Sequence, residues 1–138
     1  VIPCNKNHKS ISPEGIGKAL RTKINANLGT SKDCKDYEAE LDKVQTAVKL
    51  GADSIMDLST HGDTRIFRRV LTEKCTAMIG TVPIYDSVIH HQKDLAFLTA
   101  KDFLDTVRLH AEDGEYCQSR RQSAFCMDAY DRPGKSLL

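Results

Sequence analysis

Residues 53–71 read DSIMDLSTHGDTRIFRRVL, and this stretch contains a strand signal followed directly by a helix signal. We predict that Asp53 to Leu58 is a strand and that Ser59 to Gly62 is a turn. Asp63 is a residue type that caps helix N-termini. The apolar residues after it fall on one helical face: Ile66, Phe67, Val70 and Leu71. The stretch therefore predicts one strand–helix unit.

The same order of signals precedes this unit. Thr22 to Leu28 alternates apolar and polar residues, which predicts a short strand that ends at Gly29. Asp36 to Leu50 follows as an amphipathic helix, with Gly51 where a C-terminal cap belongs. The apolar stripe of this helix consists of Tyr37, Leu41, Val44 and Val48.

A third unit comes next in the chain. Ala77 to Ile84 is predicted to be a strand, with Pro83 at its end because proline cannot donate a ladder hydrogen bond. Asp86 to Leu98 is predicted to be a long loop. Thr99 and Asp102 form a capping-box signature for a helix that closes near residue 114. Its predicted buried residues are Phe103, Leu104, Val107 and Ala111.

Three consecutive βα units predict an α/β fold with parallel strands joined by right-handed crossovers. A complete (β/α)8 barrel needs about 250 residues, so a chain of 138 residues provides only a partial (β/α)8-type barrel. We divide the chain into an irregular lead-in (1–21), a partial βα barrel domain (22–114) and a tail (115–138).

Charge and hydropathy exclude two classes of partner. The formal net charge is +1, which offers no basic surplus for nucleic acid or for an anionic membrane. The sequence contains no apolar run long enough to span a bilayer and no secretory signal, so we expect a soluble, cytoplasmic protein. A start at Val1 indicates a processed chain or a fragment.

The cysteines and histidines predict no metal site. The chain has five cysteines, and their spacing matches neither a zinc knuckle nor a cluster-binding triad. They are Cys4, Cys34, Cys75, Cys117 and Cys126. Scattered reduced thiols are the expectation for a protein of the cytosol.

Candidate binding residues lie where the predicted strands end, because parallel α/β folds bind ligands at the carboxyl ends of their strands. Asn27, Met56 and Tyr85 follow one another at the same interval, so we expect them to converge on one cleft. Taken singly, each is more readily explained as a turn or packing residue.

Two weaker signals accompany these residues. The run of Ser59, Thr60 and Gly62 before a helix could bind a phosphate, yet it matches neither a Walker loop nor GxGxxG. Arg68 and Arg69 fit a solvated helix face better than an anion site.

The separated motifs, taken together and in order, resemble the phosphomethylpyrimidine synthase family. They are VIPCNKNH, GIGKALRTKINANLGTS, GADSIMDLSTHGD, IGTVPIYD and LTAKDFLDTVRLHAEDG, all within residues 1–114. The resemblance implies a radical S-adenosylmethionine enzyme that rearranges aminoimidazole ribotide into the pyrimidine of thiamine. It also implies that Asn27, Met56 and Tyr85 bind the ribonucleotide substrate. The related hydroxybenzimidazole synthase of cobalamin lower-ligand synthesis has similar motifs and remains an alternative.

The departures from the family pattern concern catalysis. His61 stands where the family usually has glycine, and it would crowd the turn if that position needs a positive φ. The family also uses a [4Fe-4S] cluster, S-adenosylmethionine and zinc, whose ligands this chain lacks. We therefore assign no cofactor and no catalytic residue to this chain, and we expect a truncated or frame-altered member that is inactive alone.

Three hypotheses follow for its role. The first hypothesis is that the chain retains part of the ribotide site. The second is that it is a noncatalytic homo-oligomer that covers its exposed sheet edges by self-association. The third hypothesis is that it completes a barrel with a separately encoded partner.

Overall fold

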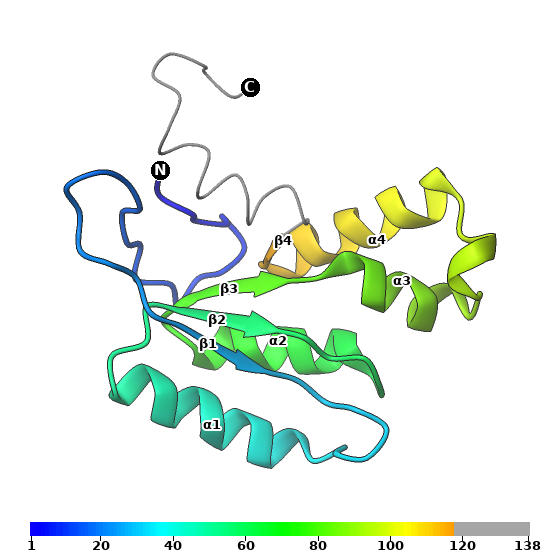
Figure 1. The fold of residues 1–138 in the computed structure, drawn as a ribbon, viewed down its shortest axis with the longest axis horizontal. Coiled ribbons are helices and arrows are strands. Elements are labelled where there is room, and N and C mark those ends of the chain that lie inside the picture. The colour runs from blue at the N-terminus through cyan, green and yellow to red at the C-terminus, as the bar shows by residue number, and fades with distance from the viewer. Residues whose placement is uncertain (118–138) are drawn as a thin grey trace.

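The computed structural model describes residues 1–117, in which strands and helices alternate along the chain (Figure 1). In chain order the elements are β1 (Asn25–Leu28), α1 (Tyr37–Lys49), β2 (Ser54–Asp57), α2 (Thr64–Lys74), β3 (Met78–Thr81), α3 (Pro83–His91), the 3-10 helix η1 (Leu95–Phe97), α4 (Ala100–Asp113) and β4 (Tyr116–Cys117). Residues 1–21 contain turns and bends but no helix or strand.

The strands form one parallel sheet in the order β1-β2-β3-β4. Figure 1 shows the arrows of β1, β2 and β3 side by side and pointing the same way. The predicted α/β class with parallel strands and alternating βα units is therefore confirmed. The short strand β4 lies within the segment that the sequence assigned to the tail.

Apolar side chains on one face of the sheet pack against α1 and α2. Sheet residues Leu28, Ile55 and Ile79 are buried in a cluster with Val44 of α1 and with Phe67 and Leu71 of α2. The ring of Tyr37 stacks on Phe67 at 5.1 Å between centroids. The prediction that Ile66 is buried is wrong, because 61% of this residue is exposed.

The predicted caps are present. Asp36 accepts hydrogen bonds from the backbone N–H groups of residues 38 and 39, and Asp63 accepts one from Ile66. Thr99 and Asp102 form the reciprocal capping box of α4. Gly114 ends α4 with a φ of 100°, a left-handed conformation that favours glycine.

The predicted loop over Asp86 to Leu98 is wrong for most of its length. Pro83 does not end a strand but occupies the first turn of α3. Backbone N–H groups in this turn have no partner within the helix, so the lack of an N–H group in proline costs no hydrogen bond there. Asp86 also lies in that turn, where the positive end of the helix dipole favours a carboxylate. Pro83 and Asp86, which the sequence predicts to end a strand and to begin a loop, therefore lie together in the first turn of a helix.

The buried face of α4 is polar, contrary to prediction. Leu104 is 63% exposed and Ala111 is exposed, whereas Thr106, His110 and Asp113 are buried. The reason is the neighbouring helix α2, which presents a buried arginine to this face.

Arg68 is that arginine, and only 2% of its side chain is exposed. Its Nη1 atom lies 2.9 Å from Asp86 in α3, and its Nη2 atom lies 3.5 Å from Asp113 in α4. Its Nε atom lies 3.3 Å from a carboxylate oxygen of Glu115. The prediction of a solvated face is therefore wrong for Arg68, although Arg69 is largely exposed. Buried charges are tolerated when they are paired in this way.

His110 completes this group, which we call the Arg68 cluster (Arg68, Asp86, His110, Asp113 and Glu115). Its Nε2 atom lies 2.9 Å from Asp86, and its Nδ1 atom lies 2.8 Å from the hydroxyl of Thr81 at the end of β3. The cluster therefore joins α2, α3 and α4 to the sheet.

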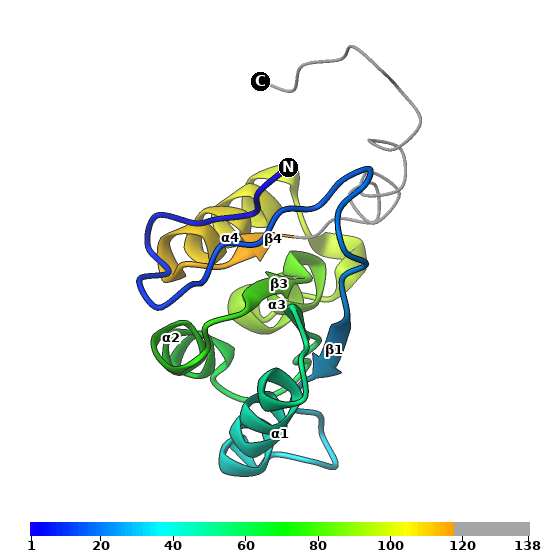
Figure 2. The same ribbon diagram turned by 90° about the vertical axis from the view of Figure 1, so that its left-hand side faces the viewer.

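The lead-in is hydrogen-bonded to the far end of the described chain. The Asn5 amide donates to the carbonyl oxygens of Ala111 and Glu115 at 2.9 and 2.8 Å. The Asn7 amide donates to the carbonyl of Glu112 at 3.0 Å. In Figure 2 the lead-in, drawn in dark blue, runs beside α4 and β4. The bonds to Ala111 and Glu112 satisfy carbonyl groups in the last turn of α4, where a helix leaves such groups free.

Glu115 is the member of the Arg68 cluster whose buried carboxylate is not hydrogen-bonded within the described residues. Burial raises its pKa well above the ordinary value, and repulsion from Asp57 raises it further, whereas Arg68 acts in the opposite direction. Folding therefore takes up a proton here, and the free energy of unfolding should fall as the pH rises from about 4.5 through the folded pKa.

We predict that Glu115→Gln flattens this pH dependence. At pH 8 the variant should be more stable than the parent by about 1 kcal/mol or more, because glutamine is neutral and folding no longer has to take up a proton at this position. Urea unfolding at several pH values between 5 and 8 measures the effect. Glu112→Gln, at the exposed neighbouring acid, is the matched control and should keep the parent's slope. Equal slopes in all three proteins would contradict the prediction.

Candidate functional site

Two of the three predicted binding residues are neighbours in the sheet. Asn27 of β1 pairs in register with Met56 of β2, which in turn pairs with Gly80 of β3. The adjacent residue Leu28 is buried on the helix-covered face, so Asn27 and Met56 point to the opposite face. Asn27 is exposed and Met56 is half-buried there.

The polar side chains of this face are hydrogen-bonded to one another. The Asn25 amide donates to the Asn27 side-chain oxygen at 2.8 Å. The Ser54 hydroxyl donates to the Asn25 side-chain oxygen at 2.9 Å. The bond from Asn25 uses one acceptor site of Asn27 and leaves its amide N–H groups pointing away from that contact.

Tyr85 is placed differently from the other two. It lies in the first turn of α3, directly after the carboxyl end of β3, and 46% of it is exposed. The position that lines up with Asn27 and Met56 across the sheet is Gly80 and not Tyr85. The equal spacing in sequence therefore does not correspond to equal positions on the strands.

The loops after β1 and β2 are held against each other at the same end of the sheet. The backbone N–H of Thr30 donates to the hydroxyl of Ser59 at 3.1 Å, and that hydroxyl donates to Asp57 at 2.6 Å. On the other side, the backbone N–H of Gly29 donates to the buried carboxylate of Glu40 in α1 at 2.9 Å. These bonds fix the loops that flank Asn27 and Met56.

Asp57 is a buried acid within this contact. Burial raises its pKa, although hydrogen bonds from the Ser59 hydroxyl and backbone N–H and the charge of Arg68 act in the opposite direction. The hydroxyl of Ser59 is buried and bonded to Asp57, so it is not presented to a ligand. The phosphate-loop interpretation of Ser59, Thr60 and Gly62 is therefore not supported by the placement of Ser59.

His61 fits the turn without strain. The non-glycine residues with positive φ in the described chain are Ala19 and Gln92, and the positive φ of this turn, 88°, belongs to Gly62. The concern that His61 crowds a glycine-dependent position is therefore wrong. Its carbonyl oxygen accepts a hydrogen bond from the hydroxyl of Thr30 at 2.6 Å, which adds to the contact between the loops.

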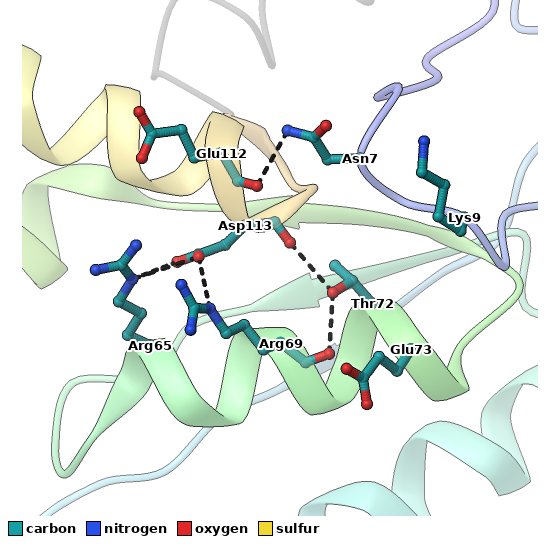
Figure 3. A pocket seen from close by; sticks show the side chains of 8 residues that line it. All are labelled: Asn7, Lys9, Arg65, Arg69, Thr72, Glu73, Glu112 and Asp113. Carbon is teal, nitrogen blue, oxygen red and sulfur yellow. Dashed lines mark hydrogen bonds and ion pairs between the residues drawn. The ribbon is translucent and has the colours of Figure 1, made fainter.

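A pocket of about 350 Å³ lies elsewhere, between α2, the end of α4 and the lead-in (Figure 3). Arg65 and Arg69, one helical turn apart, both direct Nε toward the buried carboxylate of Asp113. The charged residues that line the pocket are Lys9, Arg65, Arg69, Glu73, Glu112 and Asp113. Three cations thus face three acids, which gives no net attraction for an ion of either sign. No local sequence pattern indicates this pocket.

The described residues do not fit a metal ion or an iron–sulfur cluster. None of their His, Cys, Asp and Glu side chains form a group of three or more that could hold a metal. Cys4 and Cys34 are exposed free thiols and Cys75 is a buried one. Cys126 lies outside the described residues.

Comparison with known proteins assigns the family. The model of the radical SAM ThiC family matches residues 1–117. The chain belongs to this family. It is 59% identical to the phosphomethylpyrimidine synthase of Alkaliphilus oremlandii over 114 residues, which make up 83% of this chain and 26% of that protein. The enzyme of the same name from Clostridioides difficile is 57% identical over the same shares.

A third relative aligns over a longer part of this chain. The phosphomethylpyrimidine synthase of Clostridium novyi is 52% identical over 128 residues, or 89% of this chain and 29% of that protein. The chain thus spans about a quarter of the length of the curated relatives it matches. No helix among the described residues is long and apolar enough to cross a membrane.

We predict that replacing Gly29 destabilises the fold, because the loop after β2 passes directly over it. A Cβ atom at Gly29 would lie 2.6 Å from the backbone nitrogen of Ser59, and its φ is 146°. Gly51 is the matched control, with a φ of 98° and open space around its Cα. In urea unfolding, Gly51→Ala should cost about 1 kcal/mol from backbone strain alone. Gly29→Ala should cost about 1–3 kcal/mol more. Similar losses in both variants would show that the close approach of the loops has no energetic weight.

Proposed function

We propose that the chain functions in thiamine pyrimidine biosynthesis as part of a phosphomethylpyrimidine synthase, and that it carries part of the binding site for aminoimidazole ribotide. Family membership is the observation that carries this proposal. The relatives from Alkaliphilus oremlandii, Clostridioides difficile and Clostridium novyi all bear the name phosphomethylpyrimidine synthase, which favours this assignment over hydroxybenzimidazole synthesis. The biosynthetic role of such relatives also favours a cytoplasmic location.

The three binding residues offer different chemistry to a ribonucleotide. Asn27 presents an exposed amide, which can donate to and accept from a heterocycle. Met56 adds an apolar, polarisable surface beside it. The hydroxyl of Tyr85, at the start of α3, can bond the ribose or the phosphate. The placement of all three near the carboxyl ends of parallel strands supports a shared site.

We further propose that the sheet is a segment of a (β/α)8-type barrel and that turnover requires the remainder of the barrel. In the family, reductive cleavage of S-adenosylmethionine depends on the [4Fe-4S] cluster. The described residues offer no set of ligands for a cluster or for zinc. We therefore expect the described residues by themselves to bind the ribotide without converting it.

Isothermal titration calorimetry with aminoimidazole ribotide tests the proposed site. We expect saturable binding, and a weakening of about tenfold in each of Asn27→Ala and Tyr85→Phe, because each variant removes a hydrogen bond to the ligand. Asn7→Ala, which alters an exposed amide of the lead-in, is the control and should bind as the parent does. Absence of heat at millimolar ligand would rule out a ribotide site in this chain.

Self-association is a second candidate role, favoured by the edges of the sheet. Within the described chain, β1 and β4 form the two edges, and each pairs with one neighbour. Three apolar residues on η1 and α4 are also exposed, namely Leu95, Phe97 and Leu104. Unpaired strand edges promote association with another chain. A homo-oligomer, or a complex with a separately encoded remainder of the barrel, would cover these surfaces.

Sedimentation velocity measures this association directly. We expect the parent to sediment as an oligomer at micromolar concentration. Phe97→Ser removes apolar area that is 72% exposed and should shift the distribution toward the monomer. Lys101→Ser, at an exposed polar position nearby, is the control. A monomer at every concentration would contradict the self-association hypothesis.

A further inference from the structure

The start of α3 is fixed in an unusual way. Within the described chain, Val82 precedes α3 without a side-chain cap, unlike the residues that precede α1, α2 and α4. A helix of nine residues is marginal by itself, so its position must come from tertiary contacts. Pro83 sets the backbone conformation of the first turn but does not set the rotation of the helix about its axis.

Asp86 supplies the missing contact. Its Oδ2 atom accepts a hydrogen bond from Nη1 of Arg68 at 2.9 Å and lies 2.9 Å from Nε2 of His110. Its Oδ1 atom accepts a hydrogen bond from the hydroxyl of Thr64. The donors come from the first turns of α2 and from α4, so this one carboxylate joins three helices.

The carboxylate is charged in this environment. Burial acts to raise the pKa of Asp86, but the hydrogen bond from His110, the charge of Arg68 and the hydrogen bond from Thr64 outweigh it and hold that pKa well below its usual value. Only 4% of Asp86 is exposed. Ion pairs of this kind resist displacement because breaking one leaves an unpaired buried charge.

Tyr85 is the residue immediately before Asp86. Successive side chains on a helix point about 100° apart, so a fixed Asp86 determines the direction of Tyr85. Asp86 points inward and Tyr85 points outward, as their burial shows. Through Thr64, the same carboxylate holds α3 against the first residue of α2, which follows the loop after β2 and therefore Met56.

We propose that Asp86 is a positioning residue that orients the Tyr85 hydroxyl relative to Asn27 and Met56 for ligand binding. This inference rests on the proposed ribotide site. It adds a residue that does not itself contact the ligand, and it assigns one member of the Arg68 cluster, Asp86, a role in binding as well as in packing.

A double-mutant cycle with aminoimidazole ribotide tests the proposal by calorimetry. In the parent background, Asp86→Asn should weaken binding about tenfold, comparable to the loss of one hydrogen bond. In the Tyr85→Phe background it should cause no further weakening, because the hydroxyl that it positions is absent. Equal weakening by Asp86→Asn in both backgrounds would overturn the proposal.

Asp113→Asn is the matched control for stability. It removes a carboxylate of similar burial from the same Arg68 cluster but touches α4 instead of α3. It should destabilise the fold and leave ribotide affinity unchanged. If Asp86→Asn fails to fold, Thr64→Val removes one donor to Asp86 at constant shape and should give a smaller effect in the same direction.

The tyrosine NMR spectrum decides the question without a ligand. With ring-labelled tyrosine, and the Tyr85 signal assigned by its loss in Tyr85→Phe, we expect Asp86→Asn to shift or broaden that signal while Tyr37 stays unchanged. Asp113→Asn should leave the Tyr85 signal in place. An unchanged Tyr85 signal in Asp86→Asn would refute the positioning role. If Asp86→Asn shifts the Tyr85 signal but the parent chain binds no ribotide, only the proposed substrate site is refuted, and Asp86 still positions Tyr85.

Discussion

The burial of one guanidinium group, that of Arg68, determines how the second half of the domain is built. A buried cation requires carboxylates at close range, and α3, α4 and the segment before β4 each supply one, from Asp86, Asp113 and Glu115. The helices therefore meet at a charged centre instead of an apolar one. The first half is different, because α1 and α2 pack on the sheet through aliphatic and aromatic side chains.

This charged centre is close to the proposed binding surface. Asp86 adjoins Tyr85, and His110 contacts Thr81 at the last residue of β3. Asp57, at the last residue of β2, experiences the charge of Arg68 and is bonded to the loop that approaches Gly29. The carboxyl ends of the strands thus rest on hydrogen-bonded and ionic contacts, which are directional and keep the loops in one arrangement.

The strands β1, β2 and β3, the helices α1, α2 and α4 and their caps can be predicted because their signals are local. A residue such as Asp63, or the pair Thr99 and Asp102, acts on the backbone within a few residues and needs no tertiary information. The helix α3 escapes prediction because Pro83 is compatible with a strand end, although proline is equally suited to a helix start.

The polar interior cannot be predicted from hydrophobic periodicity. That method assumes that the buried face of a helix is apolar, so it selects Leu104 and overlooks His110. The pairing of Arg68 with Asp86 and Asp113 depends on how three helices pack, which no local pattern encodes. For the candidate site, Asn27 and Met56 are expected at equivalent strand ends because of their spacing in sequence, and they are neighbours in the sheet. Tyr85 lies off that row because α3 begins directly after β3.

The amides of Asn5 and Asn7 bind the carbonyl groups at the end of α4, across 104 to 110 residues of chain. A ribosome makes the lead-in before α4, so Asn5 and Asn7 must wait unpaired until that helix has been synthesised. Contacts of such long range slow folding, since the whole intervening chain has to be ordered before they form. Although it precedes the sheet in sequence, the lead-in is therefore expected to acquire its native hydrogen bonds later than the other described segments.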